Sequence, residues 1–133
     1  MRKIGFKEAL ERFGDMLNQE ADRLQASADS IIAKIMEYGM EGAAIREDAC
    51  SRVFMALYEV DPEALKIAYC LPEVSPEKRN AIIAAHVMRD LRTDRQRALK
   101  CECNIRTFQT RLYRGRKELK KKYLRLTYDF TRI

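Results

Sequence analysis

The stretch from Thr93 to Leu119 gathers the side chains that are best suited to bind another molecule. Arginine, lysine, threonine and glutamine recur there at helical spacing. Arginine and glutamine can form paired hydrogen bonds to base edges in the major groove of DNA, and threonine can contact bases or phosphates. Lysine and arginine also neutralise phosphate charges. Together these side chains predict binding to a nucleic-acid backbone, with duplex DNA as the favoured ligand.

Two capping patterns predict the helices that would position these side chains. Thr93, with Gln96 three residues later, is typical of a capping box at the start of a helix over residues 94–101. Asn104 is a strong N-cap for a second helix over residues 105–122. The short connection Cys-Glu-Cys between them predicts a helix-turn-helix.

The second helix has a predicted inward face and a predicted outward face. Ala98 of the first helix is expected to be the small residue that lets the two helices approach closely. The inward residues of the second helix are Ile105, Phe108, Leu112 and Leu119. The helical period places on the opposite, exposed side Arg106, Thr107, Thr110, Tyr113, Arg114, Lys117 and Lys121.

The candidate binding residues form two groups according to the contact that we expect each to make. The group expected to reach base edges is Arg106, Thr107, Gln109, Thr110, and Arg111 or Arg114. The group expected to hold phosphates is Arg95, Arg97, Lys100, Lys117, Lys120, Lys121 and Lys122. The alternative interpretation is a solvated basic helix with no specific partner.

The rest of the chain also predicts helices, so we expect an all-α fold. Apolar residues recur at helical spacing over residues 6–38, as one long helix or as two broken near Ser27 to Ser30, and a homodimer could form through this stripe. A third helix is expected through Ile45 to Leu57. Asp61 and Ser75, each followed by Pro-Glu, predict two further helix starts, the first helix ending at Leu71 and the second near Leu91.

Charge divides the chain into two regions of opposite sign. Residues 1–76 carry 9 Lys and Arg against 14 Asp and Glu, whereas residues 77–133 carry 17 against 6. Together with the helix pattern, this split predicts an acidic helical domain over 1–71, for oligomerisation or protein contact, and a basic DNA-binding domain over 72–133.

No segment has the length and apolarity of a membrane span, and the amino terminus lacks the apolar core of an export signal. We therefore expect no membrane partner and a cytoplasmic location, with the four cysteines reduced. Cys101 and Cys103 do not have the paired spacing that structural zinc requires. The single histidine, His86, lies among apolar residues, and no nucleophile–base pair is visible. We expect no metal, no cofactor and no enzymatic activity.

A resemblance to a known module covers a little over a third of the chain. Residues 72–119 resemble region 4 of the sigma-70 class, through L-P-E-V-S-P-E-K-R-N-A-I-I, T-D-R-Q-R-A-L-K-C-E-C-N and I-R-T-F-Q-T-R-L-Y-R-G-R-K-E-L. In overall size and in the carboxy-terminal placement of this module, the chain is similar to small phage late-gene regulators of the ArpU/RinA type. It also resembles Q-type antiterminators, which share a related helix-turn-helix ending in a Leu-Lys-Cys-like segment. Two residues depart from the module: Arg97 replaces an aliphatic residue, and Glu102 replaces a glycine that is frequent in the turn.

The resemblance implies two functions, which the residues alone do not separate. The first is a sequence-specific, phage- or mobile-element-encoded regulator of transcription that reads the major groove with helix 105–122. The second is a factor that binds RNA polymerase in the bacterial host cytoplasm, as an antiterminator or sigma-like factor. A third interpretation, RNA binding, rests on the rings of Tyr113, Tyr123, Tyr128 and Phe130.

Overall fold

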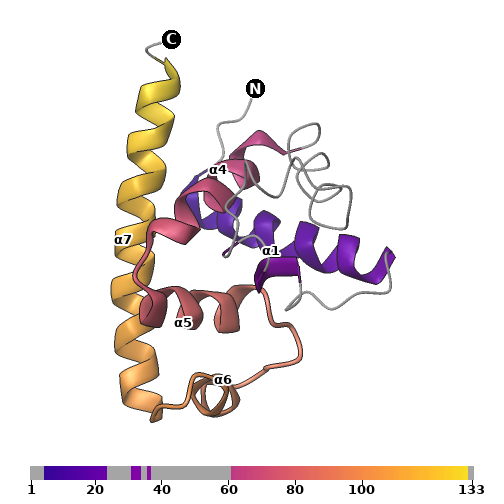
Figure 1. Ribbon diagram of the computed structural model, residues 1–133, viewed down its shortest axis with the longest axis vertical. Coiled ribbons are helices and arrows are strands. Elements are labelled where there is room, and N and C mark those ends of the chain that lie inside the picture. The colour runs from indigo at the N-terminus through magenta and orange to yellow at the C-terminus, as the bar shows by residue number, and fades with distance from the viewer. Residues whose placement is uncertain (1–4, 24–30, 34–35, 37–60, 132–133) are drawn as a thin grey trace. The chain divides into compact units, whose positions relative to one another are not determined.

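The computed structural model describes residues 5–23, 31–33, 36 and 61–131, with side chains in the last helix described as far as residue 126. The described residues are mostly helical and contain no strand, so the prediction of an all-α protein is confirmed for them (Figure 1). The chain divides into two compact units, Met1–Pro72 and Glu73–Ile133.

In the first unit, helix α1 (Phe6–Arg23) packs against helix α4 (Pro62–Cys70). Residues three and four apart along α1 turn one apolar face inward, and Leu10, Phe13 and Leu17 are fully buried on it. As predicted, Asp61 caps α4, because its Oδ1 accepts a 3.3 Å hydrogen bond from the amide of Ala64. The predicted helix at 45–57, and residues 24–30, 34–35 and 37–38 of the 6–38 stripe, lie outside the described residues.

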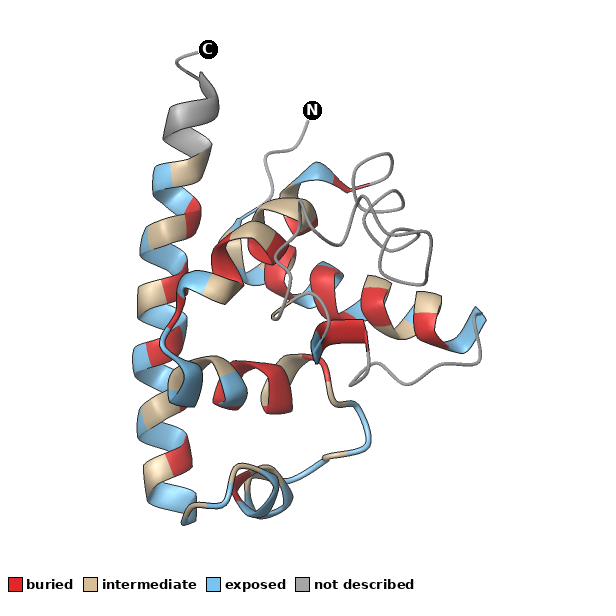
Figure 2. Ribbon diagram, viewed as in Figure 1, coloured by how far each residue is buried: buried red, intermediate tan, exposed pale blue. Residues whose placement is uncertain are grey.

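The second unit consists of α5 (Pro76–His86), α6 (Asp94–Lys100) and the 27-residue α7 (Ile105–Thr131), after a short 3-10 turn at Leu71–Glu73. Helix α7 packs against α5, and α6 packs against both, near the amino-terminal end of α7 (Figure 1). Figure 2 shows buried residues along α5. The centre of α5 (Ala81 to Ala84) and Ala98, Phe108, Leu112 and Leu119 are all buried.

Gly115 sets how closely α5 and α7 approach each other. It is buried, and a Cβ atom there would lie 3.1 Å from the carbonyl oxygen of Lys78 and 3.1 Å from Cδ1 of Ile82. Because the helix carries no side chain at this position, the two backbones can come close together. This close approach positions the amino-terminal half of α7 relative to α5.

Four predicted helix ends were wrong, and one of them is that of α4, which ends at Cys70 rather than Leu71. Helix α5 ends at His86 rather than near Leu91, since the amides of Val87 and Met88 both bond to the carbonyl of Ile83 and close the helix. The apolar pattern misled because Val87 remains buried after the helix has ended. Helix α6 ends at Lys100, one residue early, and α7 continues to Thr131, past the predicted end at residue 122.

Ser75 precedes α5 as predicted, but its side chain makes no capping hydrogen bond; Pro76 occupies the first turn.

Candidate nucleic-acid interface

Side-chain caps fix where α6 and α7 begin. The Thr93 hydroxyl accepts a hydrogen bond from the amide of Gln96, and the Gln96 side chain accepts one from the amide of Thr93, so the predicted capping box is present. The Asn104 Oδ1 accepts a 2.7 Å hydrogen bond from the amide of Thr107, which confirms the predicted N-cap of α7. Each cap satisfies amides that would otherwise lack a partner within the helix.

The connection between α6 and α7 turns through a left-handed residue. Glu102 has a φ of 57°, and among the described non-glycine residues it alone has a positive φ. The amide of Cys103 bonds back to the carbonyl of Ala98 at 3.0 Å, and that of Glu102 to Leu99 at 3.1 Å, as in a Schellman-type helix end. Glycine adopts this conformation with less strain, so the sequence departure noted at Glu102 coincides with a strained backbone position.

The amino-terminal half of α7 presents a continuous exposed face. Its exposed members are Arg106, Gln109, Thr110, Tyr113, Arg114 and Lys117, and Lys121 continues the same face into the second half of the helix. The Lys117 ammonium lies 5.0 Å from the centre of the Tyr113 ring, a distance at which a cation–π contact forms. On α6, Arg95 and Lys100 are exposed as well. The structure therefore brings most of the predicted binding residues to one side of α7.

Ile105 was predicted to face inward, and that prediction was wrong. Its side chain is 42% exposed, whereas Phe108, Leu112 and Leu119 are buried as expected. Ile105 is the first residue of α7, where no preceding turn covers it. Together with Leu99, which is 80% exposed, it lines a shallow concavity of about 580 Å³ beside Arg106.

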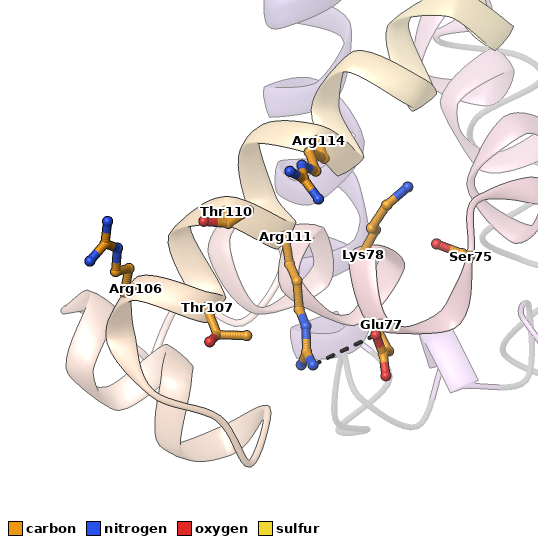
Figure 3. Close-up of a pocket in the computed structure, with 8 residues that line it drawn as sticks. All are labelled: Ser75, Glu77, Lys78, Arg106, Thr107, Thr110, Arg111 and Arg114. Atoms are coloured by element: carbon orange, nitrogen blue, oxygen red, sulfur yellow. Dashed lines mark ion pairs between the residues drawn. The ribbon is translucent and has the colours of Figure 1, made fainter.

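A groove of about 440 Å³ lies between α7 and the start of α5 (Figure 3). Its lining residues are Ser75, Glu77, Lys78, Arg106, Thr107, Thr110, Arg111 and Arg114. Thr107 and Arg111 are half-buried at the edge of the exposed face, and an Arg111 Nη atom lies 3.6 Å from a Glu77 carboxylate oxygen. Lys78 pairs with Glu118 at 3.1 Å. Both pairs join α5 to α7, so the groove has a wall that carries charges of both signs.

Arg97 and Gln109 both meet the carboxylate of Asp94. Arg97 Nη1 donates to Asp94 Oδ1 at 2.9 Å, and Gln109 Nε2 donates to Asp94 Oδ2 at 3.0 Å. The Arg97 Nε also donates to the carbonyl of Leu91 at 3.2 Å. The hydrogen bonds from Gln109 and Arg97 hold the pKa of Asp94 below its ordinary value. Arg97, which was predicted to hold phosphate, is thus half-buried and makes its hydrogen bonds within the protein. The hydrogen bond from Gln109 to Asp94 links α7 to α6.

Sequence reasoning missed three residues that position α7: Asp94, Gly115 and Arg116. Gln109 and Asp94 are 15 positions apart, and Arg116 bonds to His86 across 30 positions. The one available signal was a glycine inside a strongly helical pattern, which often marks close backbone approach.

The cysteines show no metal site among the described residues, where no group of three metal-binding side chains comes together. Cys101 and Cys103 are half-buried, and the Cys101 thiol lies 3.7 Å from the carbonyl of Asn80. Burial raises the pKa of Cys101. In the described parts of the chain, no helix combines the length and apolarity of a bilayer span.

No protein-family model, curated protein or solved structure matches this chain.

Proposed function

We propose that this protein is a sequence-specific DNA-binding regulator of transcription, in which α6 and α7 act as a helix-turn-helix and α7 enters the major groove. The observation that carries the proposal is the exposed amino-terminal face of α7, which displays guanidinium, amide and hydroxyl groups side by side. An α-helix with its side chains is about 10–12 Å across, and the major groove is about 12 Å wide. A helix that bears these groups has the dimensions and the donors that the groove requires.

The connection between the two helices supports the same proposal. A helix-turn-helix needs a small residue in the first helix and a tight turn, so that the second helix projects from the domain. Ala98 is 2% exposed, and Glu102 makes the left-handed turn four residues later. The resemblance to sigma region 4, which covers residues 72–119, includes this segment, and it remains part of the proposal.

We assign each side chain a role in the proposed complex from its exposure. Arg106, Gln109, Thr110 and Arg114 are exposed and are assigned to base edges, with Thr107 and Arg111 at the groove edge near Glu77. The exposed residues assigned to phosphates are Arg95, Lys100, Lys117 and Lys121.

Selection of duplexes from a random pool, followed by titration, tests the proposal. We expect enrichment of one sequence, at least 10³-fold tighter binding than to unrelated duplex, and a slope of log K against log salt of about −4 to −5 for five phosphate contacts. Arg106→Ala with Arg114→Ala should abolish the preference, whereas Lys7→Ala in α1 is the matched control. Equal affinity for all duplexes would contradict the proposal.

Contact with RNA polymerase is the second candidate function. The exposed apolar pair Leu99 and Ile105 favours it, because large exposed apolar side chains that gather together often mark protein contacts. Retention on core polymerase by the Arg106→Ala, Arg114→Ala protein, and its loss in Leu99→Glu, would separate polymerase contact from DNA contact.

A further inference from the structure

We infer that Asp94 holds the side-chain amide of Gln109 in one orientation, so that α7 selects adenine at one position of its DNA site. The inference deepens the proposed function and rests on it. Gln109 would be the residue that touches the base, and Asp94 a positioning residue that acts through it.

A chain of hydrogen bonds fixes the Asp94 carboxylate. The Leu91 carbonyl accepts from Arg97 Nε at 3.2 Å, and Arg97 Nη1 donates to Asp94 Oδ1 at 2.9 Å. The other carboxylate oxygen, Oδ2, then accepts from Gln109 Nε2 at 3.0 Å. Each carboxylate oxygen thus has a separate donor, and the planar guanidinium restrains the orientation of the carboxylate.

The chemistry of the two groups determines which way the Gln109 amide turns. An ionised carboxylate only accepts hydrogen bonds, so the amide must offer it the NH₂ group rather than the carbonyl oxygen. An aspartate is ionised at neutral pH, and the pKa of Asp94 lies below the ordinary value because Gln109 and Arg97 donate hydrogen bonds to its carboxylate. One N–H of Gln109 is used in this bond, which leaves the carbonyl oxygen and the second N–H for a ligand.

The remaining donor and acceptor of Gln109 match one base in the major groove. Adenine presents the N6 amino group as a donor and N7 as an acceptor, and glutamine pairs with both at once. Gln109 lies three residues after Arg106 and four before Tyr113, and all three are exposed on the same face of α7. The fixed amide would therefore meet the same stretch of groove as the Arg106 guanidinium.

Pool selection with four variants tests the inference. Wild type should fix an A·T pair at one position of the selected site. Gln109→Ala and Asp94→Ala should both lose the preference at that position, roughly 5- to 100-fold, and leave the other positions unchanged. Asp94→Asn should lose it too, because Arg97 and Gln109 donate to separate carboxylate oxygens and asparagine offers an acceptor in only one of those two places. Asp94→Ala should add no further loss to Gln109→Ala.

Replacing the selected adenine by 7-deazaadenine removes only the N7 acceptor, and this should weaken wild type but not Gln109→Ala. Thermal unfolding of each variant checks that the fold is intact. A wild-type preference unchanged in Asp94→Ala would overturn the inference, as would a loss spread over all positions, which marks a purely structural role. If wild type enriches no sequence at all, the proposed function fails and the inference fails with it.

Discussion

Arg116 Nε in α7 donates a 3.0 Å hydrogen bond to Nε2 of His86, the last residue of α5. The bond requires a neutral imidazole, because a protonated one has no acceptor nitrogen. Burial, reinforced by the positive charges of Arg116, Arg89 and Arg97, lowers the pKa of His86 from 6.5 to about 4. This neutral histidine links the carboxyl end of α5 to the middle of α7.

Acid should therefore destabilise the second unit through His86. The unfolded chain binds a proton at this residue below pH 6.5, whereas the folded protein resists protonation until about pH 4. The contribution to stability is full above pH 6.5 and is lost as the pH falls towards 4. We expect a loss of about 2 kcal/mol, less than the whole shift implies because the ring is partly exposed.

Urea unfolding of wild type and His86→Gln between pH 7 and 4 measures this loss. Glutamine can accept a hydrogen bond from Arg116 but does not titrate. The free energy of unfolding of wild type should therefore fall relative to that of His86→Gln as the pH falls. Parallel pH profiles would show that His86 is not responsible.

Glu102→Gly should stabilise the protein. A side chain at a φ of 57° costs about 1–2 kcal/mol, and the greater unfolded-state entropy of glycine offsets about 0.5–1 kcal/mol of the strain that is relieved. We expect a gain of about 0.5–1 kcal/mol and a melting temperature a few degrees higher. Glu102→Ala is the control: it removes the carboxylate but keeps the strain, and an equal gain there would point to charge instead.

Gly115→Val should destabilise the contact between α5 and α7. Any Cβ at this position would meet the Lys78 carbonyl at 3.1 Å, and a backbone oxygen cannot move without displacing its helix. We expect a cost of about 2–3 kcal/mol, measured by thermal or urea unfolding. Lys120→Val, at an exposed position of the same helix, is the control and should carry only the helix-propensity cost of about 0.5 kcal/mol. Equal losses of stability at the two positions would contradict the packing argument.

Arg95 and Arg97 should differ in their effect on DNA binding, although the sequence assigns both to phosphates. Arg95 is exposed, whereas Arg97 is half-buried and bonds to Asp94 and Leu91. Arg95→Gln should reduce the salt slope of binding by about 0.9, the value for one phosphate. Arg97→Gln should leave the slope unchanged and lower the melting temperature. A reduced slope in Arg97→Gln would show that Arg97 contacts a phosphate and would contradict this prediction.

The features that sequence reasoning predicted best are those set by residues close together in the chain. The capping box at Thr93 and the N-cap at Asn104 each depend on partners three residues away, and both are present. Ala98 and Phe108 are buried as the helical period requires. Such features need no knowledge of how the helices cross.

The missed features depend on contacts between distant segments. The bond from Arg116 to His86 and the groove between α7 and Glu77 exist only because α5 and α7 meet near Gly115. No periodicity within one helix predicts such a contact. Ile105 was misassigned for a related reason, since a helical period assumes a neighbouring turn that the first residue of α7 lacks.

The Asp94 carboxylate has an electrostatic consequence for the proposed complex. It is a negative charge, only partly neutralised by Arg97, beside the face that would meet a polyanion. Its repulsion would weaken binding to every duplex by a similar amount, whereas the amide that it orients would strengthen binding to one. Because specificity is a difference between affinities, such a residue lowers overall affinity and raises the ratio between the right site and all others. A regulator built in this way would leave bulk DNA readily and dwell at its own site.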